Sequence, residues 1–284
     1  LADAACSRWP RHERAACLWA YAAMEKAHKG AVPDRELLDE AERTCAAAAA
    51  RGGVESLFAL GLLRRNRGDL DGALRAWQAG WKRDPGHRRT LESLADLCFD
   101  LGRERAAARF YGELDRIPPP RARVCYRLAL CAAAGVDSLP DPAAADYAEA
   151  GVARYLERAL ELDPDHAGAL RTRAWLLLRT SRLRGRWEDP ALRREDAAAA
   201  RELLLRALAA APTSAPLSHA LGWISLACGE PDEAEVLLRR ALAHDPAYAP
   251  ALADLAVLLE EEGRGAPGEV ERLRRRARRA TDDP

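Results

Sequence analysis

A set of apolar, small and proline residues recurs every 34 residues, and a fixed interval of this length limits the chain to a stack of similar structural units. The set first appears as Leu57, Leu60, Gly61, Ala73, Trp77, Gly80 and Pro85. It follows again as Leu91, Leu94, Ala95, Ala107, Tyr111, Leu114 and Pro119. It returns as Ser218, Leu221, Gly222, Ala234, Leu238, Ala241 and Pro246.

Each unit is predicted to be a pair of helices. The first positions of the set are spaced i, i+3 and i+4, which places them on one helical face. Gly68 and Gly229 interrupt the unit at its middle, where glycine ends a helix. The second helix is expected to end at Asp84-Pro85 and Asp245-Pro246, because a residue before proline resists helical geometry. Small residues such as Gly61 and Gly222 would let the second helix cross closely over Ala73 and Ala234.

This pattern resembles the tetratricopeptide-repeat (TPR) family, whose units have the same length and the same order of large, small and proline positions. The resemblance implies an all-α TPR solenoid of about seven antiparallel helix pairs in a right-handed superhelix, with residues 1–284 as one array. Residues 1–53 are expected to hold a degenerate first pair, 54–262 the recognisable repeats, and 263–284 a closing helix.

Two repeats are longer than the rest, with insertions near residues 136–150 and 180–194. One is expected to close on Val152, Leu156, Ala159 and Pro164, and the other on Ala199, Leu203, Ala207 and Pro212. Much of each insertion should lengthen the second helix at its start, with an irregular loop over Thr180–Asp189.

Composition argues against several classes of function. Lys+Arg and Asp+Glu are balanced at 44 each, so the chain has no general attraction to nucleic acid or anionic lipid. No apolar run is long enough to predict a membrane span. The seven cysteines form no Cys-x-x-Cys pair, which favours a reducing, cytoplasmic compartment. The chain begins at Leu1 and not at Met, so a removed signal peptide and a neighbouring domain both remain alternatives.

The TPR resemblance implies that the first helices of successive repeats line a concave, partner-binding surface. The residues expected there lie at i, i+4 and i+7 spacing on the side of each first helix opposite its packing positions. Most of them have bulky apolar side chains. They are Phe58, Leu62, Tyr126, Leu130, Arg171, Trp175, Leu178, His219, Trp223 and Leu226. Trp175 and Trp223 hold the same position in adjacent repeats, and Trp is favoured as an interface anchor. Alternatively, these large side chains pack on the neighbouring first helix.

Some TPR proteins hold a partner's C-terminal carboxylate with Lys and Asn at these positions. Here the matching positions include Glu92 and Asp96, whose charge would repel a carboxylate, so we do not expect that clamp.

Other motifs give weaker signals. Gly263, Gly265 and Gly268 match a nucleotide-binding spacing but follow a predicted helix rather than a strand, so a loop is expected. Cys6, His12, Cys17 and His28 match no compact metal site, and no cofactor is predicted. Arg179, Arg182, Arg184 and Arg186 of the second insertion are expected to face solvent, and the alternative is contact with an acidic partner or a phosphate. The arginines of residues 272–279 are also expected to face solvent, with contact to RNA or anionic lipid as the alternative.

The predicted function is a protein–protein interaction scaffold that binds a peptide or helix of a partner in an apolar and aromatic groove. The alternative is a regulatory or targeting module of a larger enzyme or sensor. An RNA-binding array ranks third, and an enzyme last, because no catalytic motif with its required context was found.

Overall fold

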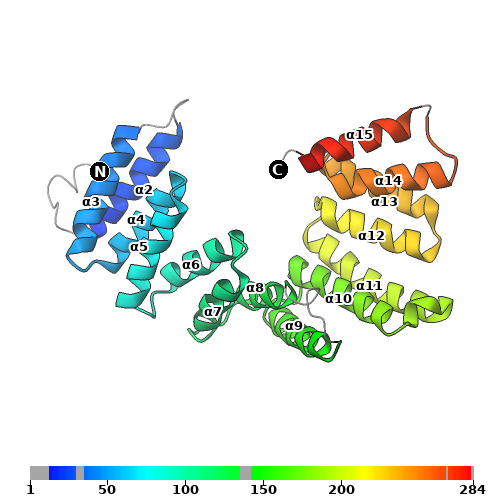
Figure 1. The fold of residues 1–284 in the computed structure, drawn as a ribbon, viewed down its shortest axis with the longest axis horizontal. Coiled ribbons are helices and arrows are strands. Elements are labelled where there is room, and N and C mark those ends of the chain that lie inside the picture. The colour runs from blue at the N-terminus through cyan, green and yellow to red at the C-terminus, as the bar shows by residue number, and fades with distance from the viewer. Residues whose placement is uncertain (1–12, 30–34, 135–141, 267, 283–284) are drawn as a thin grey trace. The chain divides into compact units, whose positions relative to one another are not determined.

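The computed structural model describes residues 13–29, 35–134, 142–266 and 268–282, and these residues form α-helices, one short 3₁₀ helix (η2) and no strand (Figure 1). The chain divides into two compact units, Leu1–Pro140 and Asp141–Pro284. The fourteen α-helices of the described residues confirm the predicted all-α repeat fold. That the units form one continuous solenoid stays a prediction.

The helices of the first unit are α2 (Glu13–Lys29), α3 (Arg35–Ala50), α4 (Val54–Asn66), α5 (Leu70–Arg83), α6 (Arg88–Asp100), α7 (Glu104–Asp115) and α8 (Ala122–Ala133). α2 packs on α3, α4 on α5, and α6 on α7. Gly68 adopts a φ of 81° after α4, and the Asp69 carboxylate then accepts the Gly72 N–H to begin α5. The predicted glycine stop between the two helices of a repeat is therefore confirmed.

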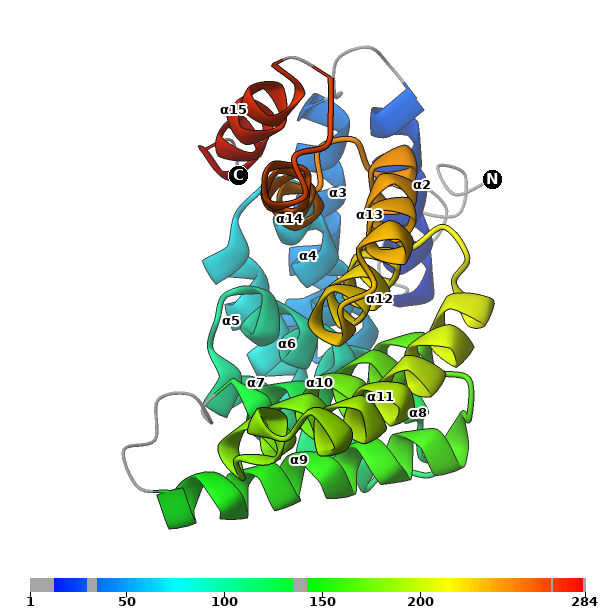
Figure 2. The same ribbon diagram turned by 90° about the vertical axis from the view of Figure 1, so that its right-hand side faces the viewer.

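The second unit contains α9 (Pro142–Leu162), α10 (Ala167–Leu183), η2 (Arg186–Glu188), α11 (Pro190–Ala210), α12 (Ala215–Cys228), α13 (Pro231–His244), α14 (Ala249–Glu261) and α15 (Glu269–Asp282). α10 packs on α11, α12 on α13, and α14 on α15, as both views show (Figures 1 and 2). Ala234, Leu238 and Ala241 are fully buried at the positions that the repeat assigns to the core.

Arginines on second helices link successive repeats in this unit. Arg206, Arg240 and Arg276 donate hydrogen bonds to the carbonyl oxygens of Pro164, Pro212 and Pro246, at 2.8, 3.4 and 2.6 Å. Each proline closes the preceding repeat. Because Arg276 of α15 makes the same contact as Arg240 of α13, α15 is the second helix of the last pair.

The second insertion departs from its prediction in two ways. Helix α10 continues to Leu183, so Thr180–Leu183 are helical, and the irregular segment is confined to Arg184–Asp189. Within α11 the buried residues are Ala200 and Leu204, whereas Ala199 is exposed and Leu203 half-buried. The prediction of Ala199 and Leu203 was therefore one residue out of register, because the spacing of the other repeats, counted back from Ala207 and Pro212, falls on Leu204 and Ala200.

Candidate functional site

In the first unit, the exposed sides of α4, α6 and α8 form a surface dominated by internal ion pairs. Helix α6 carries an acidic stripe of Glu92, Asp96 and Asp100 at four-residue spacing. Arg121 and Arg123 from the α8 side pair with Glu92 and Asp96, and Arg65 of α4 pairs with Asp100, at 2.6–3.3 Å. The expected repulsive acidic patch is thus largely neutralised by the protein's own arginines.

Phe58 does not lie open on this surface. Its side chain is buried, with the guanidinium of Arg89 above its ring at 4.5 Å and the edge of His87 against it at 6.0 Å. His87 in turn contacts a Glu55 carboxylate oxygen at 3.0 Å through Nε2. Phe58, which the sequence analysis placed among the partner contacts, is thus covered by His87, just before α6, and by Arg89 at the start of α6. Leu62, Tyr126 and Leu130 are half-buried.

In the second unit, the exposed sides of α10, α12 and α14 form a surface that we call the Trp175 face. Unlike the ion-paired surface of α4, α6 and α8, it exposes a large aromatic side chain. The Trp175 indole is 41% exposed, although it is one of the largest apolar side chains of the chain. The Arg179 guanidinium lies 5.6 Å from its ring centroid. Arg179 is held by the nearly buried carboxylate of Glu149 at 2.8 Å, which fixes the cation beside the ring.

Trp223 has a neighbour that the repeat pattern did not predict. Its ring stacks on that of Trp187 with centroids 6.0 Å apart and planes inclined by 18°. Trp187 belongs to η2, so part of the second insertion packs beside α12. Because Trp187 has no counterpart in the other repeats, the 34-residue alignment could not place it.

A salt link holds the insertion in place. Arg186 makes two hydrogen bonds to the Asp196 carboxylate, at 2.8 and 3.0 Å, and Ser181 donates to the same group at 2.5 Å. The hydrogen bond from Arg186 lowers the pKa of Asp196 below its ordinary value, with a further contribution from Ser181 and against the opposing effect of burial. The carboxylate of α11 thus ties together the end of α10 and η2, next to the Trp187–Trp223 stack.

The remaining predicted residues of the second unit fall into different environments. Leu178 is 7% exposed and packs in the core with Leu204 and Leu221, so its side chain leaves little surface to a partner. His219 is held by Asp254 of α14 at 2.9 Å and by an edge contact with Tyr248 at 5.5 Å. Leu226 is half-buried and packs against the core of the last repeats.

Arg171 is exposed and forms no ion pair with any residue that the structure describes. It lies close enough to Tyr248 to act on it electrostatically: burial raises the pKa of Tyr248, and the positive charge of Arg171 opposes that rise. Arg171 therefore sits near the His219 and Tyr248 end of the Trp175 face, with its own charge uncompensated.

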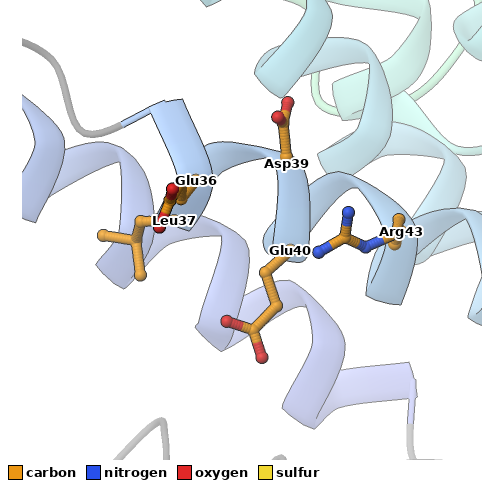
Figure 3. A pocket seen from close by; sticks show the side chains of 5 residues that line it. All are labelled: Glu36, Leu37, Asp39, Glu40 and Arg43. Carbon is orange, nitrogen blue, oxygen red and sulfur yellow. The ribbon is translucent and has the colours of Figure 1, made fainter.

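Two open hollows lie away from this face. One, of about 410 Å³, is lined by Glu36, Leu37, Asp39, Glu40 and Arg43 of α3. Figure 3 shows these side chains spreading along one helix instead of converging on a point. The other, of about 360 Å³, lies between α15 and the turn before α14. Neither brings together the groups that an active site needs.

The other sequence motifs acquire no chemistry from the fold. Gly263 and Gly265 lie in the loop between α14 and α15, as predicted. Of the four residues considered as metal ligands, Cys17 is buried in a helical core, and the placements of Cys6, His12 and the His28 side chain lie outside the described residues. In the described part of the chain, no group of three or more His, Cys, Asp or Glu could hold a metal, and no helix is long and apolar enough to span a bilayer.

Comparisons with known proteins agree with the repeat architecture. Residues 191–243 and 229–270 match a family model described as tetratricopeptide repeat. No curated protein matches the sequence.

Several solved structures match the fold at low sequence identity. TTC0263, a thermophilic TPR protein of Thermus thermophilus, is 21% identical, with a TM-score of 0.54 over 73% of this chain and 99% of that chain. A TPR protein of Parabacteroides merdae ATCC 43184 is 16% identical, with a TM-score of 0.61 over 93% of each chain. YrrB, described as a TPR protein with an unusual peptide-binding site, is 13% identical, with a TM-score of 0.50 over 73% of this chain and 95% of that chain.

The 34-residue pattern, the paired helices with buried small residues at their crossings, and these matches agree with one another. Residues 191–270 thus match the tetratricopeptide-repeat family, and the helix pairs of the described residues have the fold of solved tetratricopeptide-repeat proteins.

Proposed function

We propose that this protein binds a peptide or helix of a partner on the Trp175 face of its second unit. A TPR fold suggests a protein–protein interaction scaffold, and one structural neighbour, YrrB, is a TPR protein with a peptide-binding site. Those likenesses support the class of function. The choice of surface rests on the side chains of this chain.

The exposure of Trp175 is the observation that carries the proposal. An indole offers a large apolar area, and leaving it 41% exposed forgoes the free energy that its burial would supply. In protein interfaces, Trp is enriched among the residues that dominate the binding free energy. The cation of Arg179 on the ring orients the indole and leaves the rest of the ring available to a partner.

The other predicted residues of this face take supporting roles in the proposal. Trp223 is half-buried and stacked on Trp187, so its ring is held in place and offers a partner less exposed surface than Trp175 does. His219 is preoriented by Asp254, and exposed Val257 of α14 extends the apolar area. Leu62, Tyr126 and Leu130 of the first unit stay proposals for additional contacts, on a surface where charges are already paired.

The test compares two truncations of exposed apolar side chains. Peptides selected from a random library on the immobilised protein would be titrated against wild type, Trp175→Ala and Leu205→Ala. Leu205 is 53% exposed on second helix α11, so its loss removes a similar kind of side chain away from the Trp175 face. We expect Trp175→Ala to weaken binding by about thirtyfold and Leu205→Ala to leave it unchanged. Equal affinity of wild type and Trp175→Ala would refute the assignment of the anchor.

A further inference from the structure

Two arginines with uncompensated charge flank Trp175 on helix α10. Arg171, Trp175 and Arg182 lie within about 40° of one another around the helix axis, because their spacing of four and seven residues follows the helical repeat. Arg171 lies about 6 Å before Trp175 along the axis, and Arg182 about 10 Å after it. Both arginines are exposed, and neither forms an ion pair with a residue that the structure describes.

This arrangement contrasts with the equivalent side of the first unit. There, Arg65, Arg121 and Arg123 are all paired with carboxylates of α6. On α10 itself, Arg179 is neutralised by Glu149. The two free charges therefore remain on the same helical stripe as the exposed indole, where a bound partner would meet them.

We propose that the segment bound on the Trp175 face is acidic, with an apolar residue for Trp175 placed between two carboxylates for Arg171 and Arg182. This inference rests on the proposed function and specifies the class of ligand. Charge complementarity supplies orientation, because the indole alone would accept an apolar side chain from either direction. Guanidinium groups also suit carboxylates, since their planar forks can donate two parallel hydrogen bonds.

The axial spacing predicts the spacing of the ligand. An extended chain advances about 3.3 Å per residue, so a segment laid along α10 would place its apolar residue about two positions from one acidic residue and about three from the other. The contacts are made by side-chain carboxylates, so the segment can lie anywhere in the partner's sequence. This distinguishes it from the clamp for a terminal carboxylate that the sequence argued against.

A synthetic peptide gives a direct test. The probe is a fluorescein-labelled Gly-Ser-Glu-Ser-Leu-Gly-Ser-Glu-Ser-Gly, compared with the same peptide carrying Gln in place of both Glu. Fluorescence anisotropy would measure their affinities for the full chain at low ionic strength, where exposed charges are least screened. We expect the Glu peptide to bind about tenfold more tightly than the Gln peptide, and added salt to reduce that difference.

Protein variants localise the effect. Arg171→Gln and Arg182→Gln should each weaken binding of the Glu peptide by about twofold to fivefold and leave the Gln peptide unaffected. The matched control is Arg194→Gln, because Arg194 is exposed on second helix α11 and its loss changes the net charge equally. An equal loss in Arg194→Gln would show general attraction and overturn the assigned contacts. Equal affinities of the two peptides, or binding of neither up to about 1 mM, would also overturn the proposal.

The proposed function and this inference fail in different ways. If Trp175→Ala abolishes binding of both peptides while the arginine variants change nothing, the anchor stands and the acidic preference falls. If the arginine variants discriminate between the peptides while Trp175→Ala binds as wild type does, the acidic preference stands and the anchor falls.

Discussion

Gly61 lies directly against the indole of Trp77. A Cβ added at Gly61 would come within 2.1 Å of Trp77 Nε1, far inside contact distance. The same nitrogen donates a hydrogen bond to the carbonyl oxygen of Phe58 at 3.0 Å, so the fully buried ring is held on the surface of α4 at this point. The equivalent pair in the repeat of α12 and α13 is Gly222 and Leu238, where an added Cβ would lie 3.2 Å from Leu238 Cγ. The residue facing Trp must therefore lack a side chain, whereas the one facing Leu has slightly more room.

Gly61→Ala is expected to destabilise the protein by about 1–3 kcal/mol, because the added methyl group must displace the Trp77 indole. Urea unfolding followed by circular dichroism would measure the change. Gly112→Ala in α7 is the matched control, since an added Cβ there has no neighbour within 4 Å. This control should gain about 0.5–1 kcal/mol from helix propensity. A Gly61→Ala variant as stable as wild type would contradict the packing of Trp77 on α4.

Substitutions at Gly222 should depend on side-chain size. Gly222→Ala requires Leu238 to move by only a few tenths of an ångström, so we expect a small effect. Gly222→Leu overfills the crossing with Leu238 and the Ala234 backbone and should cost about 1–3 kcal/mol. Thermal unfolding of the two variants side by side would show whether the helices cross here, and similar melting temperatures would argue against it.

Removing the stacked ring of Trp187 and removing the exposed ring of Trp175 should have different effects on the free energy of unfolding. Trp187→Ala removes the ring that stacks on Trp223 and should lower stability by about 1–3 kcal/mol. Trp175→Ala removes an exposed ring and should change stability by less than about 0.5 kcal/mol. Chemical unfolding of both variants would test this. A larger loss for Trp175→Ala would mean that its ring serves the core.

The Asp196 carboxylate should make the second unit sensitive to acid. Because its pKa is lower in the folded protein than in the unfolded chain, ionised Asp196 stabilises the fold above its ordinary pKa of 3.8. That contribution disappears as the pH falls through the folded pKa. Asp196→Asn should therefore lower the melting temperature at pH 7 and reduce its fall between pH 5 and pH 2.

The control for this experiment is Glu195→Gln, which removes the neighbouring and more exposed partner of Arg186. Arg186 and Ser181 act on Asp196 through hydrogen bonds, Arg186 also through its charge, and Glu195 acts on Arg186. The Gln variant should keep most of the acid dependence of wild type. An unchanged melting profile in Asp196→Asn would show that the link between η2 and α11 does not stabilise the fold.

The sequence by itself determined the repeated unit, the helix pairs and most of the helix ends. These depend on local chemistry: the helical spacing of Leu57, Leu60 and Gly61, the positive φ that Gly68 adopts, and the proline after Asp84. Each acts within a few residues and recurs at a fixed interval, so the pattern can be recognised without knowing what packs on it. The burial of Ala234, Leu238 and Ala241 followed from the same alignment.

Only the tertiary structure decided which side chains of the first helices face outward. Leu178 and Trp175 lie on neighbouring parts of one helical face, yet Leu178 is in the core and Trp175 is exposed, because exposure depends on where α11 and α12 cross α10. The partners of Trp223 and Glu92 come from outside their own helices, in a segment that breaks the repeat and in helix α8 and the residue before it. A pattern read along the chain records neither the crossing angles nor the insertion's path. The surface left for a partner is what those long-range contacts do not cover, and for that reason it had to be found in three dimensions.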